Sequence, residues 1–311
     1  NEIVNSFVYF LTENNGIGGW MFYETIIENI QLPQNATLIG PSAFAYSSLK
    51  SITIPNAVTS IGGNAFVGCA SLVNVTIPEG VTEIPASAFS SCTSLTSISI
   101  PSSVTEIAFR AFNGCSSLSS VIIGNGVTSI GDNAFEDCSY LASINLPDAL
   151  TSIGSAAFHN CSSLASIYIP DAVATIGNGA FYGCTILKSV EFSSESSLTL
   201  IDELTFRECS SLISISIPDA VTEIASSAFY ECSSLVSAIV GSGVTSIGDN
   251  AFYHCTSLES LNLPDALTSI GESAFSGCSA LTSINIPDGV TSINKSTFWG
   301  CTSLTSVTIG N

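Results

Sequence analysis

The chain has 311 residues, of which 46% are hydrophobic and only 10% are charged, so it holds ample apolar material for a core. Five Lys and Arg residues against 25 Asp and Glu residues give a net charge of −20. Five scattered cations cannot neutralise a run of phosphates, so nucleic acid is excluded as a partner and an anionic membrane surface is disfavoured. No apolar run approaches the ~20 residues of a membrane span, and we predict none in this chain.

The first 29 residues precede the regular pattern that fills the rest of the chain. Two apolar runs, at residues 7–11 and 20–23, flank an Asn14-Asn15-Gly16 turn. These features predict a β-hairpin. Because the open end of a repeat array needs a cover, we expect residues 1–29 to form an N-terminal cap.

From residue 30 to residue 311 the chain repeats one motif. Its 11 cysteines follow one another at steps of 23 residues, except for one step of 25 residues between Cys184 and Cys209. A phenylalanine lies three residues before each cysteine, and Phe44 extends the series by one repeat. A fixed period of this length over about twelve units indicates a solenoid that forms a single domain. The extra residues of the longer repeat fall within residues 193–197.

Every repeat has the same elements in the same order. Leu95, Ile98 and Ile100 alternate with polar residues, which predicts a strand that Pro101 ends. A turn and a short second extended piece follow, as at residues 127–130. A further turn then leads into the Ala-Phe pair, for which we predict about one helical turn. One repeat cannot bury its own apolar face, so the strands are expected to stack in one continuous parallel sheet.

The consensus L-x-x-I-x-I-P-x-x-V-T-x-I-G-x-x-A-F-x-x-C resembles the BspA-like class of leucine-rich repeat over residues 30–311. The resemblance implies an α/β-type, strand-dominated solenoid, namely a right-handed leucine-rich repeat superhelix of about twelve 23-residue coils with short helical or 3-10 turns. Similar repeats occur in secreted and surface proteins and are linked to adhesion or host-protein binding. The resemblance therefore implies an extracellular or cell-surface location.

The cysteines occupy one position in every repeat and form a column. Neighbours about 5 Å apart are within disulfide reach, but side chains that point the same way disfavour the required dihedral angle. Zinc sites need paired spacings such as C-x-x-C, which the chain lacks, so we predict no metal. We predict a buried ladder of free thiols, each bonded to a backbone carbonyl in its own turn. The ladder comprises Cys69, Cys92, Cys115, Cys138, Cys161, Cys184, Cys209, Cys232, Cys255, Cys278 and Cys301.

Two further columns have a structural and a functional interpretation. A threonine recurs on the second extended piece, with Ala174 as the gap, and suits either an exposed hydroxyl ladder or a flat ice-binding face. We favour the ladder because glutamates such as Glu83 interrupt the surface. Aspartates that follow the prolines, such as Asp219, suit either turn hydrogen bonds or a column of calcium sites. We favour turn hydrogen bonds because Asn and Ser fill the same position in other repeats.

The sequence has no catalytic constellation. His159 and His254 are four repeats apart, and a G-x-S-x-G elbow, a phosphate-binding loop and a metal-binding His pair are all missing. Most serines form a repeated column, which indicates a structural role. We predict that the protein is not an enzyme and uses no cofactor.

Departures from the repeat are where we expect binding. Tyr168 and Glu191 stand out in a sheet-face column of mainly Ser, Thr and Asn, next to the longer repeat. Exposed aromatic and Arg side chains are enriched in binding patches, and five successive repeats carry one directly after the Phe. This aromatic strip consists of His159, Tyr182, Arg207, Tyr230 and Tyr253. We predict that it contributes more to binding than the sheet face, by packing against sugar rings or an extended peptide, while Arg207 pairs with a carboxylate.

Two functional hypotheses follow. The first is a non-catalytic extracellular or cell-surface recognition and adhesion scaffold that binds protein or glycan. The second is a structural building block that self-associates end to end into a surface filament or layer. The second rests on the near-identity of the repeats and on a C-terminal end, at residue 311, that we expect to be uncapped.

Overall fold

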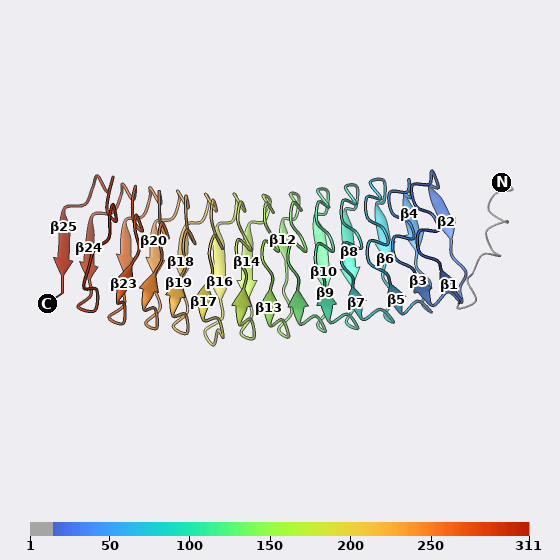
Figure 1. The fold of residues 1–311 in the computed structure, drawn as a ribbon, viewed down its shortest axis with the longest axis horizontal. Coiled ribbons are helices and arrows are strands. Elements are labelled where there is room, and N and C mark those ends of the chain that lie inside the picture. Colours follow the sequence, from blue (N-terminus) through green and yellow to red (C-terminus); the bar gives the residue numbers. More distant parts are fainter. Residues whose placement is uncertain (1–14, 311) are drawn as a thin grey trace. The chain divides into compact units, whose positions relative to one another are not determined.

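The structure is a computed structural model that describes residues 15–310. It divides the chain into two compact units, Asn1–Leu150 and Thr151–Asn311. Each unit is a parallel β-solenoid in which each repeat forms one turn, here called a coil, and most coils contain two short strands (Figure 1). The described residues contain no helix.

Unit 1 has two lines of parallel strands. In the first line, β2, β4 and β6 form one sheet and β8, β10 and β12 another; in the second, β1, β3 and β5 form one sheet and β7, β9 and β11 belong to a five-stranded sheet. The strands of the first line are β2 Asn29–Gln31, β4 Ser51–Thr53, β6 Asn74–Thr76, β8 Ser97–Ile100, β10 Ser120–Ile123 and β12 Ser143–Ile144. Those of the second are β1 Gly16–Ile17, β3 Leu38–Ile39, β5 Ser60–Ile61, β7 Glu83–Ile84, β9 Glu106–Ile107 and β11 Ser129–Ile130.

Unit 2 repeats this arrangement. The first line contains β14 Ser166–Ile169, β16 Ser189–Phe192, β18 Ser214–Ser216, β20 Ser237–Ile239, β22 Ser260–Asn262, β24 Ser283–Ile286 and β25 Ser306–Ile309. The second contains β13 Ser152–Ile153, β15 Thr175–Ile176, β17 Leu200–Ile201, β19 Glu223–Ile224, β21 Ser246–Ile247 and β23 Ser269–Ile270. The prediction of one continuous sheet is wrong, because the second extended piece also pairs in parallel and each line is broken into separate sheets.

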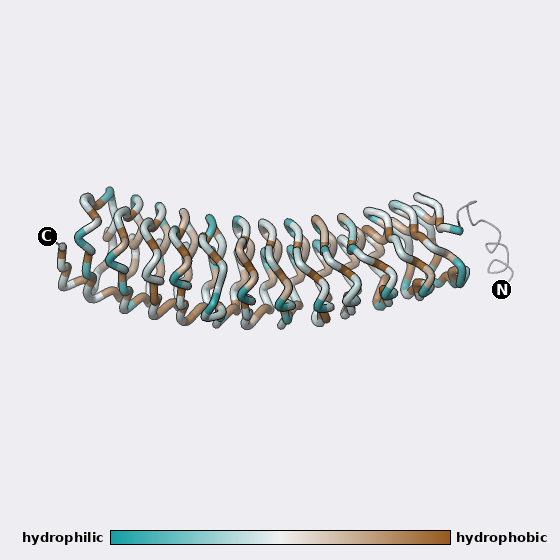
Figure 2. Tube along the Cα trace, turned by 90° about the horizontal axis from the view of Figure 1, so that it is seen from below, coloured by the Kyte–Doolittle hydropathy of each residue, from teal (hydrophilic) through white to brown (hydrophobic). Residues whose placement is uncertain are grey.

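The core of each unit is a stack of identical side chains from successive coils. In unit 2 the phenylalanine rings stack with centroids 5.0–5.7 Å apart, and in unit 1 they are 5.1–5.4 Å apart. Inward-facing Leu, Ile and Val of the strands complete the core. Hydrophobic segments accordingly recur in every coil between hydrophilic turns (Figure 2). The stacking confirms the strand-dominated solenoid that the repeat predicts.

The turn that carries the Ala-Phe pair is not helical, so the predicted helical or 3-10 turns and the α/β class are wrong. The Phe229 N–H donates to the Ala251 carbonyl of the next coil at 2.7 Å, whereas the Tyr230 N–H donates to Ser227 in its own turn at 3.2 Å. Every second N–H group therefore donates to the next coil and not within its own turn, so no i→i−4 series of hydrogen bonds forms. Ser227 and Glu231 have φ values of 57° and 58°, which alternate the backbone between left- and right-handed conformations.

Residues 15–29 form a coil of the array. β1 pairs in parallel with β3, and the Phe22 ring stacks on Phe44 at 5.1 Å. Residues 20–23 lie in turns and not in the predicted strand. The other predicted strand of the hairpin, residues 7–11, lies outside the described residues, so the cap over residues 1–29 stays a prediction.

Candidate binding surfaces

The cysteines form the predicted ladder of free thiols, which are buried at ten positions and half-buried at Cys301. The Cys232 thiol donates to the Phe206 carbonyl at 3.1 Å, and the same contact recurs along both units. The acceptor belongs to the Phe of the preceding coil, so the expectation of a carbonyl in the same turn is wrong. Burial raises the pKa of Cys115 and of Cys184 from the ordinary 9.0 to about 12. A buried thiol that stays protonated is neither a nucleophile nor a metal ligand, which makes the ladder a structural feature.

The threonine and aspartate columns also join one coil to the next. The Thr245 hydroxyl donates to the Thr222 carbonyl at 3.1 Å, and Thr268 donates to Thr245 at 3.0 Å. Asp219 Oδ1 accepts the Ser242 N–H at 2.7 Å and its hydroxyl at 3.0 Å, and these hydrogen bonds lower the pKa of Asp219. The aspartate thus bonds the following coil and not its own turn. Within residues 15–310 no group of three or more His, Cys, Asp or Glu side chains could hold a metal ion.

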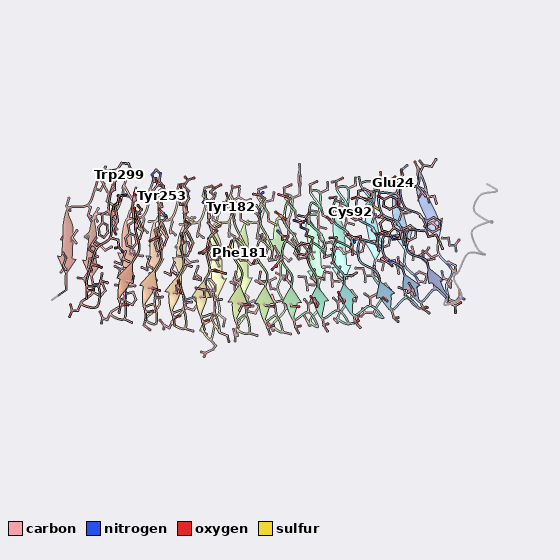
Figure 3. All side chains as sticks on the ribbon, viewed as in Figure 1. Glu24, Cys92, Phe181, Tyr182, Tyr253 and Trp299 are labelled. Carbon is pink, nitrogen blue, oxygen red and sulfur yellow. The ribbon has the colours of Figure 1, made fainter. Side chains whose placement is uncertain are left out.

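The structure brings the whole aromatic strip together as one stack on unit 2. Tyr230 and Tyr253 lie face to face, with ring centroids 4.8 Å apart and planes 13° apart. His159 stacks on Tyr182 at 4.8 Å. Arg207 fills the gap, with its Cζ 5.3 Å from the Tyr182 centroid and 4.3 Å from the Tyr230 centroid. Figure 3 labels Tyr182 and Tyr253 near the edge of the ribbon and Phe181 in its interior.

Glu208 holds the strip in place, a role that the sequence analysis did not assign. Arg207 Nε and the Tyr182 hydroxyl both donate to Glu208 Oε1, each at 3.2 Å. Although burial acts to lower it, the hydrogen bond to Glu208 raises the pKa of Arg207 above its ordinary value. The charge of Arg207 is therefore already balanced inside the strip.

The stacking limits what the strip offers a ligand. Tyr182 lies between His159 and Arg207, and Tyr230 lies between Arg207 and Tyr253. A second ring, His254, stacks on Tyr253 at 4.3 Å. With both faces covered, Tyr182 and Tyr230 present edges and hydroxyl groups, whereas a sugar would pack against an open face. A small groove of about 380 Å³ runs beside the strip and is lined by Glu208, Glu231, His254, Thr185, Ser210, Ser233 and Thr256.

The other predicted site, Tyr168 and Glu191, lies in a groove of about 520 Å³ on the strand side of unit 2. Tyr168 on β14 is directly opposite Glu191 on β16 in the strand register. Tyr168 is 49% exposed and Ile239 on β20 is 61% exposed, so the groove has an open aromatic and an open aliphatic surface. The structure confirms that these residues adjoin the longer repeat, because Ser193 and Ser194 also line the groove.

The two-residue insertion forms one wall of this groove, and hydrogen bonds hold it in place. The Glu195 N–H donates to the Ser193 hydroxyl and the Leu198 N–H to the Ser196 hydroxyl, each at 3.3 Å. The Ser197 N–H donates to the Asp171 carbonyl at 3.0 Å, which ties the insertion to the preceding coil. Asp219 lines the same groove, and no Lys or Arg does.

One exposed aromatic residue in the column of the aromatic strip was missed. Trp299 is 67% exposed and occupies the same position after its phenylalanine as the members of the strip, two coils beyond Tyr253. The position of Trp299 directly after Phe298 is visible in the sequence and could have identified it. Ser276 separates it from the stack, so it lies apart from the five residues of the strip.

The fold and its regular coils define a leucine-rich repeat solenoid. The family model described as "BspA type Leucine rich repeat region (6 copies)" matches residues 15–142, 128–258 and 222–311. The chain therefore belongs to the BspA-type leucine-rich repeat family. The match begins at residue 15, in agreement with the coil formed by residues 15–29.

Several solved bacterial structures are similar to this chain. A leucine-rich repeat protein from Bacteroides ovatus is 34% identical, with a TM-score of 0.78, over 88% of this chain and 70% of that protein. A leucine-rich cell surface protein from Faecalibacterium prausnitzii is 30% identical, with a TM-score of 0.61, over 96% of this chain and 92% of that one. A leucine-rich repeat protein from Eubacterium ventriosum is 25% identical, with a TM-score of 0.51, over 77% and 73%. Among curated proteins none matches the chain.

The described residues include no helix that is long and apolar enough to span a membrane.

Proposed function

We propose that this chain is a non-catalytic recognition module of a cell surface and that it binds another protein through unit 2. The observation that carries the proposal is the groove of about 520 Å³, in which Tyr168 and Glu191 break an otherwise Ser-rich strand face. Solenoids of this kind present extended surfaces built for binding. The cell surface protein of F. prausnitzii supports the location.

Protein is favoured over glycan as the ligand. Tyr182 and Tyr230, in the middle of the aromatic strip, are each covered on both faces, so neither offers an open face for a sugar ring to pack against. Ring edges, tyrosine hydroxyls and the carboxylate of Glu208 instead suit the polar groups of a protein surface. The strip is expected to form the rim of the contact and the groove its centre.

The test compares the two surfaces on arrays of secreted proteins and of glycans. One variant changes Tyr182, Tyr230 and Tyr253 together to Ser, and the other changes Tyr168 and Glu191 together to Ser. Thermal unfolding of each variant controls for folding. We expect the wild-type chain to bind a defined set of proteins, the Tyr168/Glu191 variant to lose that binding and the strip variant to retain part of it.

Other outcomes overturn the proposal in distinct ways. If only the strip variant loses binding, the aromatic strip is the binding site, as the sequence analysis predicts. Binding to glycans and to no protein replaces the proposed ligand. If the wild-type chain binds neither array while light scattering shows filaments, end-to-end assembly is the function.

A further inference from the structure

We infer that the groove beside the longer repeat takes an extended, basic peptide segment, with a Lys or Arg side chain of that segment paired to Glu191. The inference deepens the proposed function by naming the chemistry of the partner. It rests on that function for the natural partner, whereas the groove itself can be tested with peptides alone.

The shape of the groove fits an extended chain. Its lining residues come from β14, β16, β18 and β20, which are hydrogen-bonded neighbours in one parallel sheet, and from the turns that follow the last three of these strands. Three strand separations of about 4.8 Å span about 14 Å, which is the length of about four extended residues. The insertion closes one side with Ser193 and Ser194, and Pro218 and Gly241 lie among the remaining lining residues. A segment laid across the strands would therefore contact Tyr168 near one end and Ile239 near the other.

The charge of the groove selects the sign of the ligand. Its charged lining residues are Glu191 and Asp219, both exposed and both acidic. Asp219 Oδ1 is already engaged by Ser242, whereas Glu191 forms no ion pair among those found in residues 15–310. The whole chain carries a net charge of −20, which repels an acidic segment and attracts a basic one.

The apolar surfaces explain why the ligand is a side chain on a peptide and not a small cation. The Tyr168 ring and the Ile239 side chain leave 49% and 61% of their surface exposed. The methylene stem of Lys or Arg can cover such surface while its charged head reaches a carboxylate. A guanidinium can also lie over a tyrosine ring, as Arg207 does elsewhere in this unit at 4.3 Å from Tyr230. A bare metal ion would find fewer than three candidate ligands here.

The probe is a set of short synthetic peptides that alternate Ser and Val around one central residue, which is Arg, Lys, norleucine or Glu. Binding to the full chain is measured by fluorescence anisotropy at low and at high salt. We expect the Arg and Lys peptides to bind more tightly than the norleucine peptide, and the Glu peptide not to bind. The preference for a basic residue should shrink at high salt, because the groove is open to solvent.

Variants with matched controls place the binding in the groove. Glu191→Gln should weaken the Arg peptide by about fivefold at low salt, the scale of a partly exposed ion pair. Glu223→Gln makes the same change at an exposed glutamate of β19 outside the groove and should leave affinity unchanged. Ile239→Ser should weaken all the neutral and basic peptides, whereas Ile213→Ser, at an exposed isoleucine outside the groove, should weaken none.

The inference is overturned if the norleucine peptide binds as well as the Arg peptide, or if Glu191→Gln and Glu223→Gln have equal effects. A third result would also overturn it: the Arg peptide could lose all binding at moderate salt, equally for the wild type and for both Glu variants. That result would show only a general attraction of the peptide to an acidic chain. Its failure is separable from failure of the proposed function. Loss of array binding in the Tyr168/Glu191 variant without any preference for basic peptides would keep a protein ligand and reject its basic character.

Discussion

Two stacks of side chains run side by side through unit 2, one residue apart in the sequence. Phe229 and Phe252 stack with centroids 5.0 Å apart in the core, and Tyr230 and Tyr253 stack at 4.8 Å on the surface. The inner stack keeps phenylalanine in every coil, whereas the outer one changes from ring to guanidinium at Arg207. The coil spacing imposes stacking on both, but only burial requires one residue type. The inner stack therefore reports on the fold and the outer one on what the surface does.

The largest test of this comparison is a change within the inner stack. Phe229→Ala removes a fully buried ring with a stacked neighbour on each side. The lost transfer free energy and the cavity should reduce the free energy of unfolding by about 3–5 kcal/mol. Urea unfolding followed by tryptophan fluorescence and circular dichroism measures the loss.

Phe298→Ala is the matched control. Phe298 is only half-buried and stacks on Phe275 alone among the described phenylalanines. We expect a clearly smaller loss there. Equal losses at Phe229 and Phe298 would contradict a stability that depends on neighbouring coils.

The thiol ladder allows the second test, through pH. Burial raises the pKa of Cys184 to about 12, while the unfolded chain ionises near the ordinary 9.0. The contribution of this thiol is complete below pH 9, and it is lost as pH rises from 9 towards 12 because only the unfolded chain then releases the proton. The slope is about 1.4 kcal/mol per pH unit for one thiol. Cys184→Ala should flatten the decline of unfolding free energy over this range by that amount.

A thiol count controls for the oxidation state of the ladder. Ellman's reagent should find nearly no reactive thiols in the native chain and all 11 after denaturation without reductant. Parallel decline of the wild type and Cys184→Ala between pH 9 and 12 would contradict the pH argument. A count lower than 11 would show disulfides and contradict the ladder.

The sequence predicted the columns well because one period relates every coil. The steps of 23 residues placed the phenylalanines, the cysteines and the aromatic strip in separate columns, and each column is present in the structure. The local path of the turn was not predicted. Small and helix-compatible residues around the Ala-Phe pair suggested a helical turn. In a stacked array, however, every second backbone N–H group of this turn donates to the next coil instead of forming a helical hydrogen bond. Asn, Ser and Gly two residues before and after many of the phenylalanines were the available signal, since they tolerate positive φ.

The position of the candidate site was predicted from the sequence, but whether its side chains are open to a ligand was not. Register alone placed Tyr182, Arg207 and Tyr230 beside one another. It could not show that Arg207 lies between the two rings or that Glu208 takes its Nε–H, because both depend on side-chain rotamers set by the neighbouring coils. The longer repeat was recognised as an irregularity, but the wall that it builds beside Glu191 depends on how residues 193–197 fold back on Asp171.

A change within the outer stack gives the third test. Arg207→Met keeps an unbranched apolar stem but removes the guanidinium, its contacts with both rings and its hydrogen bond to Glu208. Exposed contacts between a cation and a ring contribute about 0.5–1 kcal/mol each, so we expect a loss of about 1 kcal/mol. Arg207→Lys should recover only part of this loss, because an ammonium group lacks the planar fork. A loss as large as that of Phe229→Ala would mean that the outer stack also supports the core.

The smallest expected effect concerns a column that joins coils without a core contact. Thr245→Val keeps the β-branched shape and removes one hydroxyl, which donates to the Thr222 carbonyl at 3.1 Å at an exposed position directly before β21. Water can replace this donor, so the loss should be about 0.5 kcal/mol, at the low end for a hydrogen bond.

Thr205→Val is the buried counterpart, because the fully buried Thr205 hydroxyl donates to the Asp202 carbonyl at 2.8 Å. The Asp202 carbonyl would keep only the Thr205 N–H, at 3.3 Å, and would lose the shorter hydrogen bond to the buried hydroxyl, so Thr205→Val should cost about 1–3 kcal/mol. Both values come from urea unfolding at one temperature, and an equal cost at the two threonines would show that a hydroxyl hydrogen bond stabilises this solenoid equally whether it is exposed or buried.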